Sequence, residues 1–182
     1  NIISSVKQAV SIPVTLKMRT GWDENSRNAP FLANEAEKAG ISMITVHGRT
    51  RCQMFRGKSD WKFIKKVKDS VKIPVVANGD ILNISDVRNV LNITGVDGLM
   101  IGRGCYGKPW IFQEISCNLK NEKFEPISIF EKKKIILEHF DLQREKILPF
   151  VILSITLLEL QKAYLQSHPK IMFLFQLFQN IL

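Results

Sequence analysis

The stretch Ser42-Met-Ile-Thr-Val-His-Gly48 is a short apolar run that ends in polar residues. Three further runs of the same build lie at residues 13–19, 74–80 and 98–103, and a loop and a helical stretch follow each of them. The four runs start 29, 32 and 24 residues apart, which is the length of one strand with its following helix. This alternation predicts an α/β fold with a parallel sheet over residues 1–120.

Helix formers and capping residues fill the intervals between the runs. The predicted helices span residues 28–38, residues 60–67 with Asp60 as the cap, residues 85–91 with Ser85 as the cap, and residues 109–119 with Pro109 in the first turn. After residue 120 the character changes, and apolar spacing predicts an amphipathic helix over residues 129–146. We therefore expect a helical C-terminal segment over residues 121–182, which becomes apolar and divergent after about residue 147.

Four strand-and-helix units fit either an open doubly wound sheet or one half of a TIM (β/α)₈ barrel. No Gly-x-Gly-x-x-Gly follows any run, which disfavours a dinucleotide-type doubly wound sheet. Polar side chains near the carboxyl ends of the runs favour the barrel, because barrel enzymes carry their chemistry on that face. These side chains are Lys17, His47, Asn78 and Arg103. We therefore predict the C-terminal half of a TIM barrel and expect the other half upstream.

The net charge is +9, from 26 lysines and arginines against 17 aspartates and glutamates. Residues 1–120 hold 18 of the basic and 10 of the acidic residues, so most of the excess lies there. A basic surface fits a polyanionic partner such as RNA, and it also fits simple solubility. The sequence opens without a secretory leader and its apolar runs are short, so we expect a soluble, cytoplasmic protein without a membrane partner. The three cysteines lack the spacing of a metal site. We therefore expect neither a disulfide framework nor a metal site.

The strand-end side chains each have a functional and a structural interpretation. Lys17 would bind an anion or an electron-rich ligand at a buried strand end, or form a salt bridge to Asp80. His47 would bind a ligand or transfer a proton, or it would have a purely structural role. The two arginines of the run His47-Gly-Arg-Thr-Arg51 favour an anionic partner.

Two glycine-containing loops follow the third and fourth runs. Asn78-Gly79-Asp80 and Gly102-Arg103-Gly104 would form the phosphate site of a barrel, because glycine lets backbone N–H groups approach the ligand. Both are also common turn sequences. Trp22 and Trp110 flank these loops and would stack on a base or pack in the core. Nothing beside Cys52 would activate its thiol, so we expect an inert cysteine.

Four motifs in a fixed order carry a family resemblance. They are Val14-Thr-Leu-Lys-Met-Arg-Thr-Gly-Trp22, His47-Gly-Arg-Thr-Arg51, Pro74-Val-Val-Ala-Asn-Gly-Asp-Ile81, and Leu99-Met-Ile-Gly-Arg103 with Gly107-Lys-Pro-Trp-Ile-Phe112. Over about residues 1–145 the sequence resembles the bacterial tRNA-dihydrouridine synthases, most of all their B-type branch. The resemblance implies an FMN-binding barrel followed by a helical tRNA-binding domain. It also implies that NADPH reduces the FMN, which passes a hydride to a uracil ring that has left its stack in tRNA.

The resemblance assigns cofactor-binding residues by motif position. Lys17 and His47 would contact the flavin, Asn78, Gly79 and Asp80 would hold the ribityl or phosphate region, and Gly102 and Arg103 would bind the phosphate. The catalytic cysteine of the family lies on a loop before the segment that matches Asn1. We therefore expect no catalytic residue in this chain, and Cys52 does not inherit that role.

Three functions follow from these observations. The first is the reduction of uridine in tRNA, and the second is an FMN-dependent barrel dehydrogenase that acts on a small molecule. The basic charge and the run from His47 to Arg51 favour RNA. The third is a truncated, non-catalytic remnant, which the absent half barrel and the apolar tail favour. We expect these 182 residues alone to be inactive unless the missing N-terminal half joins them.

Overall fold

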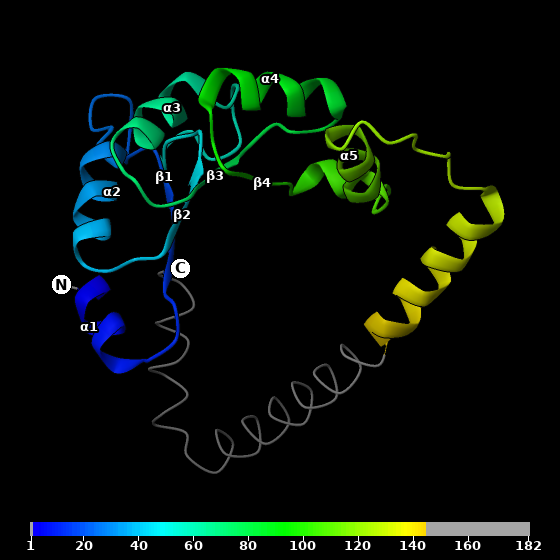
Figure 1. The fold of residues 1–182 in the computed structure, drawn as a ribbon, viewed down its shortest axis with the longest axis horizontal. Helices are drawn as coiled ribbons and strands as arrows, with labels where there is room; N and C mark the ends of the chain where they lie inside the picture. Colours follow the sequence, from blue (N-terminus) through cyan, green and yellow to red (C-terminus); the bar gives the residue numbers. More distant parts are fainter. Residues whose placement is uncertain (1, 145–182) are drawn as a thin grey trace, which may run out of the picture. The chain divides into compact units, whose positions relative to one another are not determined.

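Strands and helices alternate along the chain, as the sequence predicts (Figure 1). The computed structural model describes residues 2–144, and the chain divides after Glu125 into two units. The elements of the first unit are α1 (Ile2–Ala9), β1 (Thr15–Arg19), α2 (Ala29–Lys38), β2 (Met43–His47), α3 (Trp61–Asp69), β3 (Val75–Asn78), α4 (Ile84–Thr94), β4 (Gly98–Met100), the 3₁₀ helix η1 (Arg103–Cys105) and α5 (Ile111–Leu119). The predicted apolar tail after residue 147 lies outside the described residues.

The four strands form one parallel sheet in the order β1-β2-β3-β4. Each strand pairs with the next one along the chain, so a helical crossover connects every neighbouring pair. The register places Lys17 opposite Thr45, Arg19 opposite His47, and His47 opposite Asn78. Side chains in register point to the same face of the sheet, and alternate residues of one strand do so too. These five side chains therefore share one face.

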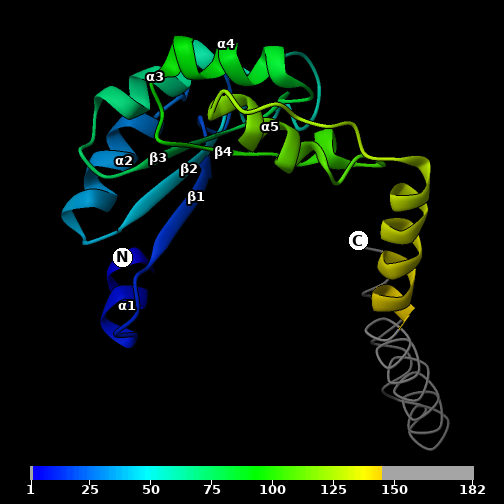
Figure 2. The same cartoon turned by 45° about the vertical axis from the view of Figure 1, so that its right-hand side comes forward.

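The opposite face of the sheet is covered by α2, α3 and α4, which lie on one side of the strands in both views (Figures 1 and 2). Small residues of α2 and branched residues of α3 and α4 pack against the alternate side chains of the strands. The buried core includes Ala29, Ala33, Ala36, Ile44, Val46, Ile64, Val67, Val75, Ala77, Val87 and Val90. Burial of this apolar surface stabilises the unit by roughly 25 cal/mol per Å². Helices on one face only are typical of a (β/α) barrel, whereas a doubly wound sheet carries helices on both faces.

The predicted helices form, with one correction to their caps. The carboxylate of Asp60 accepts a hydrogen bond from the Phe63 N–H at 3.0 Å, so Asp60 caps α3 as predicted. The cap of α4 is Asn83, whose side chain accepts from the Asp86 N–H at 3.0 Å. Ser85, the predicted cap, lies inside the helix. Both residue types cap helices well, so pattern alone favours the wrong one of two close candidates.

The described part of the second unit is a helix over residues 129–144, which starts where the apolar spacing predicts. Ser128 and Glu131 form a reciprocal capping box at its start: the Ser128 N–H donates to the Glu131 carboxylate at 3.1 Å, and the Glu131 N–H donates to the Ser128 hydroxyl at 3.2 Å. No helix among residues 2–144 has the length and apolar character needed to cross a bilayer.

Candidate functional site

The carboxyl ends of β3 and β4 border a cavity of about 110 Å³. Its lining residues are His47, Phe55, Asn78, Gly79, Asp80, Ile81, Leu82, Met100, Gly102, Arg103 and Gly104. Six of the seven residues that the sequence singles out as cofactor ligands line this one cavity. The seventh, Lys17, lies two residues before the end of β1 and points to the same face of the sheet as His47.

The environment of Lys17 differs from the expected one in two respects. The residue is exposed, whereas the sequence predicts a buried strand end. The salt bridge considered for it is also wrong, because Asp80 pairs with Arg49 and Arg103 instead. Within residues 2–144, Lys17 forms no ion pair. Its ammonium group therefore remains able to meet a ligand on the open face of the sheet.

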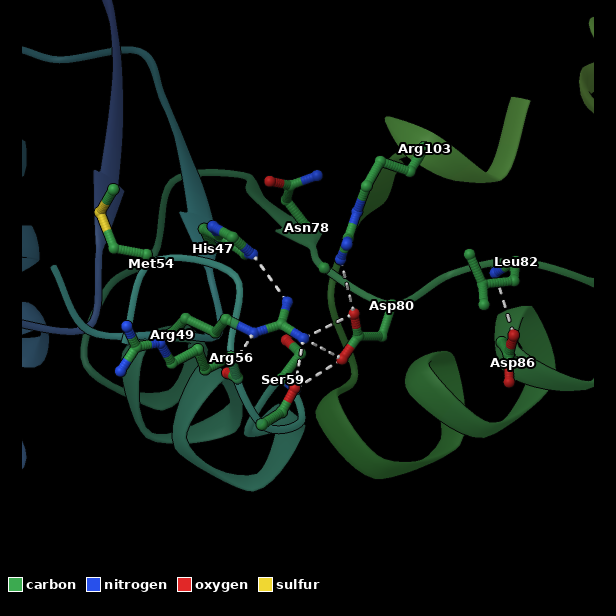
Figure 3. A network of polar contacts seen from close by, with 12 residues as sticks. His47, Arg49, Met54, Arg56, Ser59, Asn78, Asp80, Leu82, Asp86 and Arg103 are labelled. Carbon is green, nitrogen blue, oxygen red and sulfur yellow. Dashed lines mark hydrogen bonds and ion pairs between the residues drawn. The ribbon is translucent and has the colours of Figure 1, made fainter. Parts of the chain in front are cut away.

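Arg49 is the buried centre of a polar network beside the cavity (Figure 3). Its side chain is 2% exposed, and its Nη2 donates to the two carboxylate oxygens of Asp80 at 2.8 and 2.7 Å. The guanidinium also donates to the carbonyl oxygens of Arg56 and Gly57 at 3.1 and 2.7 Å. The sequence associates the arginines of residues 47–51 with an anionic partner. For Arg49 that anion is Asp80, 31 residues away in the chain.

Asp80 links Arg49 to the cavity wall. Its Oδ2 accepts the Ser59 N–H at 2.7 Å, and its Oδ1 accepts Nη2 of Arg103 at 3.3 Å. Partial burial by itself would raise the pKa of Asp80, but the hydrogen bonds from Arg49 and Ser59 and the nearby positive charges hold the pKa below its usual value. The carboxylate is therefore ionised at neutral pH and anchors the Arg103 guanidinium beside the cavity.

His47 is a neutral side chain with a defined tautomer. Burial and the positive charges of Arg19, Arg49 and Lys17 lower the pKa of His47 to about 4. Nη1 of Arg49 lies 3.2 Å from Nε2 of His47. Because a guanidinium group only donates hydrogen bonds, Nε2 must accept, and the ring proton resides on Nδ1. His47 therefore presents an uncharged N–H donor at Nδ1.

Glycine is required where the loops of the cavity pack together. Gly79 has a φ of 115°, and a Cβ atom there would lie 2.6 Å from Oγ of Ser59 and 2.7 Å from Cδ2 of His47. Nε1 of Trp61 donates to the Gly79 carbonyl at 3.0 Å and fixes the same turn. At Gly104, a Cβ atom would collide with a neighbouring backbone carbonyl. Only a residue without a side chain fits these contacts, so the packing of the loops depends on glycine at both positions.

Two side chains that sequence reasoning missed also shape the site. Nη1 of Arg19 donates to the carbonyl oxygens of Thr50 and Met54, both at 2.9 Å, and thereby holds the loop that follows β2. This loop carries Phe55 into the cavity wall, where the guanidinium carbons of Arg19 and Arg103 lie 6.0 and 5.4 Å from its ring centroid. Strand parity with Lys17 was the available signal for Arg19, whereas the position of Phe55 depends on the loop conformation.

Three further candidates lie outside the cavity lining. Trp22 is 65% exposed beneath the Arg51 guanidinium, which lies 6.0 Å from its ring, so the core position considered for Trp22 is wrong. Trp110 is half-buried at the start of α5. Cys52 is an exposed free thiol in the loop after β2. Among residues 2–144 there is no group of three or more side chains that could hold a metal ion.

Comparison with known proteins identifies one family. The family model described as Dihydrouridine synthase (Dus) matches residues 1–180. The "Probable tRNA-dihydrouridine synthase" of Rickettsia conorii is 54% identical over 142 residues, which cover 77% of this chain and 43% of that protein. The "tRNA-dihydrouridine synthase B" of Shewanella oneidensis is 49% identical over 140 residues, which cover 76% of this chain and 44% of that protein. The chain thus spans less than half the length of these relatives.

A mandelate oxidase variant is among the solved structures matched, with a TM-score of 0.44 at 17% identity over 65% of this chain and 48% of that chain. The family model extends to residue 180, beyond the resemblance seen in the sequence, which ends at about residue 145. A match over nearly the whole length, with half of the aligned residues identical in curated relatives, shows that this chain belongs to the dihydrouridine synthase family.

Proposed function

We propose that this chain forms part of an FMN-dependent tRNA-dihydrouridine synthase, which uses NADPH to reduce uridine to 5,6-dihydrouridine in tRNA. The observation that carries the proposal is the convergence of His47, Asn78, Gly79, Asp80, Gly102 and Arg103 on one cavity in a chain of this family. These residues come from the carboxyl ends of β2 and β3 and from the segments that follow β3 and β4, which lie far apart in the sequence. A purely structural role for each of them would not require a common cavity.

The donor set of the cavity fits the phosphate end of FMN. Its volume of about 110 Å³ is well below the roughly 300–1,000 Å³ of sites that enclose a whole small molecule, so we assign to it the phosphate group alone. The Arg103 guanidinium is half exposed at its edge and can pair with the phosphate. Gly102 and Gly104, on either side of Arg103 in the lining, carry no side chain that could block a phosphate.

Lys17 and His47 would contact the flavin ring, since they share the open face of the sheet. When bound, FMN supplies the hydride chemistry, with NADPH as the electron donor. The Lys17 ammonium would stabilise negative charge on the pyrimidine edge of the ring. His47, held neutral by its surroundings, would donate a hydrogen bond from Nδ1 without adding charge.

We further propose that the sheet belongs to an FMN-binding (β/α)₈ barrel. Sequential strand order and helices on one face support this architecture. The described strands supply half the number of strands in such a barrel, and the face that carries Lys17 is open. We therefore expect the 182 residues on their own to be inactive and the activity to need the complete barrel.

The proposed substrate is a uridine in tRNA, bound with help from the helical segment after residue 120. The net charge of +9 supports a polyanionic partner. The target base must leave its stack to reach the flavin. We expect the protein to work in the cytoplasm, together with its tRNA substrate.

Mass analysis of tRNA from a strain that lacks the gene tests this function. The proposal predicts loss of dihydrouridine at one or more tRNA positions, and its recovery when the full-length protein carrying this sequence is supplied on a plasmid. The 182-residue chain supplied in the same way serves as the comparison and should not restore it. Unchanged dihydrouridine in the deletion strain would contradict the proposal and favour a small-molecule substrate.

A further inference from the structure

The cavity contains a feature that is unfavourable for an anion site. Its lining carries two charged side chains, the carboxylate of Asp80 and the guanidinium of Arg103, and these lie 3.3 Å apart. A carboxylate repels a phosphate, and it also neutralises the arginine that should bind the phosphate. Taken alone, this pair would leave the cavity with no net charge to attract its ligand.

Arg49 supplies the missing positive charge without reaching the ligand. Its side chain is 2% exposed, it is not part of the cavity lining, and it contacts Asp80 from another side than Arg103 does (Figure 3). Each of its three nitrogens is engaged: Nε with the Arg56 carbonyl, Nη1 with His47, and Nη2 with Asp80 and a second carbonyl. A guanidinium held this way is a fixed interior charge.

We propose that Arg49 is a positioning residue for the cofactor phosphate: it neutralises Asp80, so that Asp80 can anchor Arg103 while Arg103 keeps its positive charge for the phosphate. The three groups, two cations around one carboxylate, then carry a net charge of one positive unit. This inference rests on the proposed function, because it requires FMN in the cavity.

An alternative role for Arg49 is to hold the loop after β2 in place by its hydrogen bonds to the carbonyl oxygens of Arg56 and Gly57. We call this role a loop tie. The two roles differ in one measurable respect. A loop tie would support the binding of any flavin, with or without a phosphate. A counter-charge to Asp80 acts on the phosphate alone, so its removal weakens the binding of FMN more than that of riboflavin, which lacks the phosphate. Any effect of Arg49 through His47 falls on both flavins equally.

The experiment measures the dissociation constants of FMN and riboflavin by fluorescence quenching in the full-length apoprotein. Arg49→Met should weaken FMN binding on the order of tenfold relative to riboflavin binding, since Asp80 then cancels the positive charge of Arg103. Arg49→Met with Asp80→Asn removes both charges and should restore the preference for FMN. Arg51→Met is the matched control: Arg51 is exposed over Trp22, and its loss lowers the net charge equally without changing the preference.

If Arg49→Met fails to fold, Arg49→Lys decides the question: it keeps a positive charge beside Asp80 but cannot reproduce the guanidinium bonds to the two loop carbonyl groups, so the preference for FMN over riboflavin should be retained. Equal weakening of both flavins in Arg49→Met, or no recovery in the double variant, would overturn the inference in favour of a loop tie. Equal weakening of both flavins in Arg49→Lys would overturn it too, because the loop contacts of Arg49 would then matter and its charge would not. A wild-type protein that binds neither flavin would refute the proposed function itself.

Discussion

His47 and Asn78 stand opposite each other in the register of β2 and β3, and both line the same cavity. Each is the last residue of its strand. One strand-and-helix unit separates them in the sequence, and parallel pairing brings their carboxyl ends to the same edge. This geometry explains how a recurring strand-end pattern becomes a site, and it gives the following predictions.

Gly79→Ala should destabilise the full-length protein by about 3 kcal/mol, because the residue combines a φ of 115° with close contacts to Ser59 and His47. Gly95→Ala is the matched control. Gly95 also has a positive φ, at 64°, but nothing lies within 4 Å of a Cβ atom there, so its cost should be about 1 kcal/mol. Urea unfolding measures both changes in the free energy of unfolding. Equal losses of stability in the two variants would show that the packing around Gly79 does not exclude a Cβ atom.

The free energy of unfolding should fall as the pH falls from 6.5 to about 4, because the pKa of His47 is lowered from 6.5 to about 4 in the folded protein. In this window the unfolded state binds more protons than the folded state, so acid favours unfolding by on the order of 2 kcal/mol. Urea unfolding at several pH values measures the slope. His47→Gln should flatten this dependence of stability on pH. An identical slope in the variant would show that the lowered pKa of His47 is not its cause.

Asp60→Ala should destabilise the protein by about 2 kcal/mol, because Asp60 both caps α3 and pairs with Arg27 at 2.7 Å. The Arg27 side chain is 15% exposed and would lose one of its two acidic partners. Asp60→Asn keeps the cap and should cost about half as much. Thermal unfolding separates the two variants. If Asp60→Asn destabilised the protein as much as Asp60→Ala does, the ion pair with Arg27 would account for the whole effect and the cap for none of it.

Cys52→Ser in the full-length protein should retain dihydrouridine formation within about twofold, because the Cys52 thiol is exposed and does not line the cavity. Mass analysis of tRNA from a complemented deletion strain measures the effect, with Cys117→Ser as a matched control on α5. A loss of a hundredfold or more at Cys52 alone would place its thiol in the chemistry.

The strands, helices and shared edge of the sheet could be predicted from the sequence because they depend on local patterns. Apolar runs spaced by one strand and helix fix the parallel order, and strand ends fix the location of His47 and Asn78. The predicted burial of Lys17 failed because burial depends on what covers the face of the sheet, and the described residues leave that face open.

The network around Arg49 could not be predicted, because its geometry depends on contacts between distant residues. Asp80 adopts a left-handed conformation with a φ of 56°, and its partners Arg49 and Ser59 lie 31 and 21 residues away. No periodic pattern encodes such a pairing. The same holds for Phe55, whose place in the cavity wall follows from the bonds that Arg19 makes to the loop.

The flavin content of the purified full-length protein tests the central claim most directly, since the strand-end residues are proposed to hold FMN. Denaturation should release FMN in near-stoichiometric amount, identified by its absorbance and by chromatography. Arg103→Met should lose most of it, whereas Arg88→Met, which changes an exposed arginine of α4 that bonds to Asn118, should retain it. A colourless wild-type protein, or equal FMN content in the two variants, would contradict the claim.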